Sequence, residues 1–134
     1  MKRNKLYYLA SPYSYNPKRY IPIISYIVGV YVRWKRFRLV SDAAVHWILK
    51  GFTFLEPIAM CHYKSTHYKM PTGYTFWKRR DRWFIRKCDG LVVLMLPGWE
   101  ESEGVQDELQ YAKKLGKEIY YMKGDDYALH KERG

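Results

Sequence analysis

The sequence is poor in cysteine, with Cys61 and Cys88 as the two examples among its 134 residues. No other cluster of ligand residues accompanies them, so they fit reduced thiols better than the disulfide framework of a small secreted domain. We expect His62 and His67 to lie in a loop, and without a third close ligand they make only a weak argument for zinc. We therefore expect neither a metal nor a cofactor, and a cytoplasmic protein.

A long apolar run is also missing. The amino end, MKRNKLYYLASPYS, passes from basic residues straight into a short strand-like run, without the apolar core of a signal peptide. The most apolar stretch, residues 20–32, is shorter than the ~20 residues that span a bilayer. We expect no transmembrane segment.

Two interpretations of residues 20–32 remain. They form either a buried helix or strand pair at an oligomer contact, or a segment that rests on an anionic membrane surface. Contact between subunits is the commoner use of such a stretch. We therefore expect a homodimer or a higher homo-oligomer.

Acidic residues are scarce: 13 Asp and Glu stand against 24 Lys and Arg, which gives a formal net charge of +11. A cationic surface attracts phosphates, nucleic acid or anionic lipid. The bases are spread over several segments with no known binding motif, so nucleic acid is a partner that we do not favour. With 48% hydrophobic residues, the chain has enough apolar surface for the core of one domain.

The most informative stretch that is present covers residues 88–122, CDGLVVLMLPGWEESEGVQDELQYAKKLGKEIYYM. Its apolar run at residues 91–96 is typical of a buried parallel strand. After Gly104, apolar residues recur at helical spacing until Gly116, and a strand follows. This unit predicts an open α/β sheet, in which ligands bind beyond the carboxyl ends of the strands. Glu108, near the start of the helix, is the carboxylate that we expect to act there, close to the protein surface.

Further elements are predicted from the same patterns. Residues 6–10 form a first strand, and Ser11 and Ser14 after it can donate hydrogen bonds to a phosphate or sugar. Residues 39–50 form a helix with Gly51 as its C-cap glycine.

Residues 52–55 form a second strand, and the loop after it carries His62, which could contact a ligand. Residues 63–74 are polar and contain glycine, which favours a mobile, lid-like loop.

Residues 76–87 form a helix rich in basic side chains, in which Asp81 is the one acid. In a structural role, Asp81 would pair with Lys78 within the helix, for only ~0.3 to 0.5 kcal/mol. In a functional role, it would be a second site carboxylate held ionised by its basic surroundings. The sequence leaves both readings open.

These segments together resemble the DUF1937 family of small phage and bacterial proteins. The resemblance rests on YLASPYS, FLEPIAMCH, and FWKRRD followed by CDGLVVLMLPGWEESEGVQDELQYAKKLGKEI, and it covers residues 5–14 and 36–122. That family is similar in turn to the nucleoside 2-deoxyribosyltransferases and the 2′-deoxynucleoside 5′-phosphate N-hydrolases. The resemblance implies a single three-layer Rossmann-like (flavodoxin-like) α/β domain over residues 1–134, with a parallel sheet, flanking helices and an insertion at residues 15–35.

The resemblance also implies roles for particular residues. Glu108 matches the nucleophilic glutamate of these enzymes, in a G-x-x-x-E pattern that begins at Gly104. Asp81 matches their second carboxylate, since both lie eight residues before the aspartate that opens the third strand, here Asp89. Tyr8 matches a site tyrosine of the first strand.

Ser102 matches a phosphate-contacting serine of the hydrolases, where the transferases have aspartate. The phosphate-binding arginine of the hydrolases would fall on Ser14, so we expect Arg36 to serve instead. The resemblance thus implies cleavage of the N-glycosidic bond of 2′-deoxynucleoside 5′-monophosphates, through a covalent glutamyl–deoxyribosyl intermediate.

Other functions stay open. The chain could be a nucleoside 2-deoxyribosyltransferase, or a noncatalytic nucleotide-binding module, because fold does not fix function. It could instead be a nucleic-acid or membrane-surface binder led by its charge. The cytokinin-riboside phosphohydrolases share a similar loop, but theirs is richer in glycine.

Overall fold

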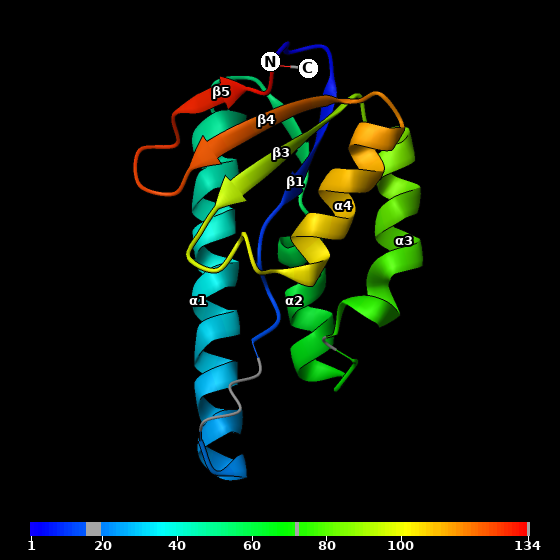
Figure 1. Cartoon of the computed structure of the whole chain (residues 1–134). Helices are drawn as coiled ribbons and strands as arrows, with labels where there is room; N and C mark the ends of the chain where they lie inside the picture. The colour runs from blue at the N-terminus through cyan, green and yellow to red at the C-terminus, as the bar shows by residue number, and fades with distance from the viewer. Residues whose placement is uncertain (16–19, 72, 134) are drawn as a thin grey trace.

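The computed structural model describes residues 1–15, 20–71 and 73–133, which form one sheet with helices on both faces (Figure 1). The strands are β1 (Leu6–Ala10), β2 (Thr53–Leu55), β3 (Gly90–Met95), β4 (Glu118–Lys123) and β5 (Leu129–Lys131). The helices are α1 (Pro22–Ile48), α2 (Pro57–His67), α3 (Tyr74–Lys87) and α4 (Glu103–Lys114). The strand order is β2-β1-β3-β4-β5, parallel except for β5. The predicted three-layer, Rossmann-like α/β fold is confirmed.

The alternation of side chains along β1 divides the core between the two faces of the sheet. Tyr7 and Leu9 belong to the cluster that packs against α1, which includes Val40. Tyr8 and Ala10 belong to the cluster on the opposite face, against α3 and α4. Tyr8 therefore faces the helix that carries the predicted nucleophile.

The order of the strands places a switch point between β1 and β3. From β1 the chain moves through α1 to β2 on one side, and from β3 it moves through α4 to β4 on the other side. The connections therefore leave in opposite directions above the carboxyl ends of β1 and β3. Ligands of open α/β sheets bind in the crevice at such a point.

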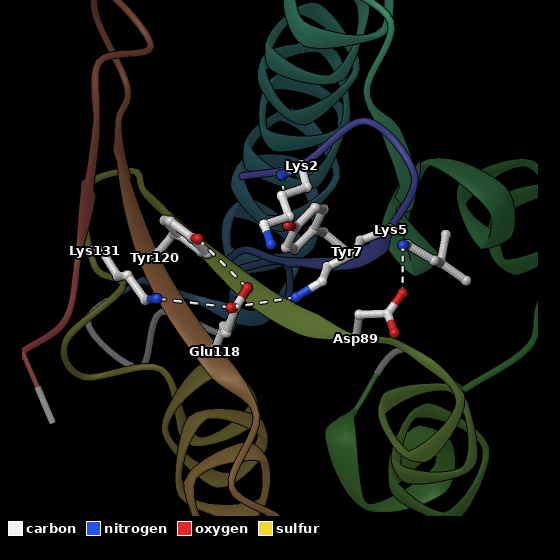
Figure 2. A network of polar contacts seen from close by, with 8 residues as sticks. Lys2, Lys5, Tyr7, Asp89, Glu118, Tyr120 and Lys131 are labelled. Atoms are coloured by element: carbon white, nitrogen blue, oxygen red, sulfur yellow. Dashed lines mark hydrogen bonds and ion pairs between the residues drawn. The ribbon is translucent and has the colours of Figure 1, made fainter.

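The amino ends of the strands are held by polar contacts (Figure 2). The backbone N–H of Leu6 donates to Asp89 Oδ2 over 2.8 Å, which ties β1 to the start of β3. Glu118 of β4 lies between Lys5, at 3.3 Å, and Lys131 of β5, at 3.6 Å. This network stabilises the end of the sheet at which the parallel strands begin. The switch point lies at the other end, beyond the carboxyl ends of β1 and β3.

Several predicted boundaries are confirmed. The first four strands lie where the apolar runs predict them, and α3 covers the predicted basic helix. Gly51 and Gly116 follow α1 and α4 with φ of +90° and +68°, a conformation that favours glycine. The N–H of Gly51 donates to the carbonyl of Ile48 over 2.9 Å, which closes the last turn of α1.

The prediction for residues 20–50 is wrong in two respects. The helix expected at residue 39 begins already at Pro22, which is suited to a first helical position because it lacks an N–H. Of the two predicted forms, residues 22–32 therefore adopt the helix and not the strand pair, and most of the large apolar side chains of residues 20–32 are exposed, not buried. The expected insertion at residues 15–35 falls largely in the first half of α1, while its residues 16–19 lie outside the described part of the chain.

The loop predicted after β2 is also wrong, because Pro57 begins the helix α2. His62 and His67 therefore lie on a helix. The helices α2 and α3 contain residues 63–67 and 74 of the expected lid, and its residue 72 lies outside the described part of the chain. The short strand β5 was not predicted. Over residues 1–15, 20–71 and 73–133, no helix combines the length and apolarity that crossing a membrane requires.

Candidate active site

A cavity of about 390 Å³ lies at the switch point of the sheet. Its walls come from β1 and the segment after it, from α2, from the start of α3, and from the start of α4. Eight of the nine predicted site residues line it: Tyr8, Ser11, Ser14, His62, Asp81, Ser102, Gly104 and Glu108. The fold thus collects residues that are up to 100 positions apart in the sequence.

Glu108 is held at the base of this cavity by Tyr8. It lies in the second turn of α4, on the face that packs against the sheet, and only 6% of it is exposed. The expectation of a surface position is therefore wrong. The phenol of Tyr8 donates a hydrogen bond to the carboxylate Oε2. Burial raises the pKa of Glu108 well above its usual value, the nearby Asp81 raises this pKa further, and the bond from Tyr8 lowers it.

Asp81 is the second buried carboxylate of the cavity, 8% exposed, on α3. Burial raises its pKa to about 7, and the guanidinium of Arg80 only partly opposes this. The idea that basic surroundings keep Asp81 ionised is therefore wrong. The intrahelical pair with Lys78 is wrong too, because Lys78 contacts Asp107 of α4 instead, at 3.6 Å.

Two polar atoms of the cavity have no hydrogen-bond partner within the described residues: Asp81 Oδ1 and Ser11 Oγ. Both are buried, and a buried polar atom without a partner costs stability. A ligand in the cavity could supply the missing partners. The binding role of Ser11 therefore stays a prediction, and its buried, unpartnered hydroxyl is the structural reason for it.

The start of α4 forms the rim of the cavity. Ser102 is the N-cap residue, and its hydroxyl oxygen accepts a hydrogen bond from the N–H of Val105 over 3.3 Å. The hydroxyl proton of Ser102 can still be donated to a ligand. Packing favours glycine at position 104, since a Cβ there would lie 3.1 Å from the ring of Tyr74.

Tyr74 is a cavity residue that the sequence interpretation missed. Its phenol donates to Asp107 Oδ2 over 2.8 Å, and Arg82 holds the same carboxylate from 2.7 Å. Burial raises the pKa of Tyr74, so the phenol keeps its proton. The predicted helix begins at residue 76 and leaves Tyr74 in the expected loop; only a helix that begins at residue 74 puts residues 74, 77 and 81 on one face, and Trp77 lines the cavity as well.

On the opposite wall, His62 and the segment after β1 support each other. His62 Nδ1 lies 2.9 Å from the hydroxyl of Tyr13, and its ring stacks on Phe37 with centroids 4.2 Å apart. Burial lowers the pKa of His62, which favours the neutral ring. His62 can therefore form a hydrogen bond with a ligand, although its ring already contacts Tyr13 and Phe37.

Arg36 is the predicted site residue that does not line the cavity. Its guanidinium donates to the backbone carbonyls of Ser14, over 3.0 Å, and Pro97, over 3.2 Å. These bonds join the segment after β1 to the segment after β3. In this structure Arg36 shapes the rim of the cavity and does not offer its charge to the interior.

The charge of the cavity is opposite in sign to that of the whole protein. Four carboxylates line it, from Asp81, Glu101, Glu103 and Glu108, and among the described lining residues there is no lysine or arginine. Neither of the two buried carboxylates forms an ion pair with a described residue, and the nearby Arg80 lowers the pKa of Asp81 only in part. Over the described ranges, no three His, Cys, Asp or Glu side chains gather into a group that could hold a metal ion.

Comparison with known proteins agrees with the resemblance at the level of the family. No curated protein matches the chain significantly. The family model described as "Domain of unknown function (DUF1937)" matches residues 5–124, which includes every element from β1 to β4 and every residue of the site above. The chain therefore belongs to the DUF1937 family.

Proposed function

We propose that this protein cleaves the N-glycosidic bond of a 2′-deoxynucleoside or of its 5′-monophosphate, through a covalent intermediate on Glu108. The observation that carries the proposal is the pair of buried carboxylates, Glu108 and Asp81, in one cavity at the switch point, with Tyr8 bonded to Glu108. The choice of deoxyribose comes from the resemblance to the deoxyribosyltransferases and the N-hydrolases.

Glu108 is the nucleophile of the proposed reaction. Its ionised carboxylate attacks C1′ of the sugar as the bond from C1′ to the base breaks, which gives a sugar ester and the free base. The bond from Tyr8 favours the ionised form of Glu108 and directs one carboxylate oxygen. Positive charge that develops on the sugar in the transition state also favours the ionised carboxylate, because the two lie in one buried site.

Asp81 is the general acid. Its pKa of about 7 keeps much of it protonated near neutral pH, so it can donate a proton to the departing base. The carboxylate that remains can then take a proton from water as the water attacks C1′ and releases Glu108. Two carboxyl groups in one cavity with different hydrogen-bond environments are what this division of work requires.

One group of donors for the phosphate of the substrate lies at the start of α4. The hydroxyl of Ser102 and the N–H groups of the first turn of α4 lie at a helix N-terminus, where the helix dipole favours an anion. Glu101 and Glu103 line the same rim and oppose an anion. The preference for monophosphates therefore rests on hydroxyl and N–H donors, because no lysine or arginine is among the described lining residues.

The same acidic lining favours a second candidate, a nucleoside 2-deoxyribosyltransferase that acts on neutral nucleosides. In that reaction another base, not water, attacks the sugar ester on Glu108. Both candidates share the first half of the reaction. They differ in whether an added base is incorporated.

The test is incubation of the protein with each deoxynucleoside and ribonucleoside and its 5′-monophosphate, followed by chromatography for free base. We expect release of base from deoxy substrates, and none by Glu108→Gln. Glu100→Gln is the matched control, because Glu100 is exposed and does not line the cavity. Release without an acceptor indicates the hydrolase, and release only with an added base indicates the transferase. A folded protein that binds nucleotides and releases no base would show a noncatalytic module and overturn the proposal.

We further propose that α1 pairs with α1 of a second copy. Four apolar side chains, Ile23, Ile27, Val30 and Trp34, follow each other at spacings of four, three and four residues and are 41% to 65% exposed. That spacing gives one stripe, as at a seam between two helices. Sedimentation should show a dimer that Ile27→Asp converts to a monomer. A monomeric wild-type protein that binds anionic vesicles would support the membrane interpretation instead.

A further inference from the structure

A second concave surface lies on a different face of α3 from the cavity. It is a groove of about 690 Å³ between α2 and α3. Its α3 members recur at helical spacing: Phe76, Trp77, Arg79, Arg80, Trp83 and Arg86. Cys61 and Lys64 of α2 and Met70 of the connection complete it. We call it the α2–α3 groove.

The charge of the α2–α3 groove is entirely positive. Lys64, Arg79, Arg80 and Arg86 line it, and no acidic residue is among its described lining residues. In the described part of the chain, none of these four forms an ion pair. Two other bases of α3, Lys78 and Arg82, form ion pairs with Asp107 instead. Three bases of α3 without an ion pair among the described residues, Arg79, Arg80 and Arg86, therefore lie on its groove face.

Aromatic faces alternate with these charges. Phe76 and Trp83 are 54% and 50% exposed, although aromatic side chains of this size are usually buried. They lie seven residues apart, which is two helical turns and about 10 Å along the axis. The groove therefore offers two separate aromatic surfaces between cationic side chains.

We propose that the α2–α3 groove binds single-stranded nucleic acid. Lys64, Arg79 and Arg86 would contact the phosphates, and unpaired bases would stack on Phe76 and Trp83. Cationic grooves with exposed aromatics bind single strands in this way, because every base has a face that can stack. A duplex keeps its bases stacked on each other, so it would use the charges but not the aromatic surfaces. An anionic membrane would meet the cations of a convex surface more readily than those of a groove.

The α2–α3 groove adjoins the cavity, since Cys61 and Trp77 line both. The link between the two sites rests on the proposed function. It explains why no lysine or arginine is among the described lining residues of the cavity. The neutral sugar and base of one nucleotide would enter the acidic cavity, and the phosphates of the neighbouring nucleotides would stay over the basic groove. The substrate class would then be a nucleotide within a single strand.

Binding can be tested apart from catalysis with the Glu108→Gln protein and a fluorescein-labelled oligothymidylate in an anisotropy titration. We expect Trp83→Ala in this background to weaken binding by roughly fivefold to 100-fold. Arg79→Ser should weaken it as well and reduce the slope of log K against log salt by about 0.7. The matched controls are Tyr26→Ala and Arg38→Ser on α1, because both side chains are exposed and belong neither to the groove nor to the apolar stripe proposed for dimerisation. They should bind like the parent protein.

Four results would overturn the inference. These are no binding at low salt, binding unchanged by both Trp83→Ala and Arg79→Ser, a duplex bound as tightly as the single strand, and groove-dependent binding of phosphatidylglycerol vesicles in place of the oligonucleotide. Circular dichroism checks that each variant is folded, and Trp83→Phe, which keeps an aromatic face, should retain most of the affinity.

A separate readout tests the step that joins the groove to the cavity. The wild-type protein should produce alkali-labile abasic sites in the oligonucleotide, and Trp83→Ala should reduce them while it cleaves free monophosphates normally. If the protein binds the oligonucleotide normally but forms no abasic sites, the groove remains a binding site and only the substrate class is refuted. Free monophosphate cleavage then shows whether the proposed function itself survives.

Discussion

The cavity and the α2–α3 groove lie on two faces of one helix and have opposite chemistry. The cavity is lined by four carboxylates without a lysine or arginine, and the groove by four cations without an acid, over the described lining residues. Two aspartates show how contact with cations changes a carboxylate, one in the cavity and one outside both the cavity and the groove. Asp107 lies among Arg82, Tyr74 and Lys78, and their contacts hold its pKa below the usual value, whereas burial raises the pKa of Asp81 to about 7. Burial without an ion pair among the described residues favours the protonated form of Asp81, and Arg80 only partly opposes this.

The largest effect expected is that of Glu108→Gln. Loss of the nucleophile should reduce base release on the order of 10⁴-fold or more, as for other residues that form covalent intermediates. Binding of single-stranded nucleic acid by the groove should be unchanged, since Glu108 does not line the groove. Chromatography and anisotropy measure the two properties separately. Equal loss of both would show that the cavity and the groove are not independent.

Asp81→Asn should reduce base release by about 10² to 10⁴-fold, the usual contribution of a general acid. Wild-type activity should fall as the pH rises above about 7, because Asp81 then loses the proton that it donates. The variant should lack this alkaline limb. Rates measured between pH 5 and 9 decide the point, and a limb that persists in Asp81→Asn would assign the acid to another group.

Tyr8→Phe should have a smaller effect, roughly 10- to 100-fold on base release, from the loss of one buried hydrogen bond to a charged group. The bond from Tyr8 lowers the pKa of Glu108, so the acid limb of the pH profile should move to higher pH in the variant. Tyr7→Phe is the matched control, because Tyr7 belongs to the other face of the sheet. An unchanged acid limb in Tyr8→Phe would show that the bond does not set the charge of Glu108.

The smallest effect concerns stability. The folded protein raises the pKa of Asp81 from 3.8 to about 7, so the protonated form favours folding. This contribution is fully present below pH 3.8 and is lost as the pH rises to about 7. Asp81→Asn should therefore raise the melting temperature by several degrees at pH 8 and have little effect at pH 4. A melting temperature that falls at pH 8 would show that the ionised carboxylate has a stabilising partner.

The sequence predicts the strands and helix ends, because their patterns involve residues that are close together in the chain. Buried parallel strands read as continuous apolar runs, and Gly51 and Gly116 mark helix ends because their φ angles are positive. The proximity of Asp81 to Glu108 was accessible only through resemblance to a family. The long-range pairing of Lys78 and Arg82 with Asp107 is a contact between two helices, so a search for partners within α3 missed it.

The errors have physical reasons too. The first half of α1 is rich in isoleucine and valine, which favour strands, and the helix forms there as a continuation of a packed second half. For α2 the signal is present, since Pro57 opens the helix, but a loop is predicted after the second strand. The α2–α3 groove escaped notice because Lys64 joins the bases of α3 only in three dimensions.

The central claim is that Glu108 forms a covalent bond to the sugar, and the configuration of the product tests it most directly. Base release from a β-linked 2′-deoxynucleoside or its monophosphate in the presence of methanol gives a methyl glycoside, whose anomeric configuration is measured by NMR. Two displacements, first by Glu108 and then by methanol, predict the β-glycoside, with retention. The α-glycoside would show a single displacement and contradict the account.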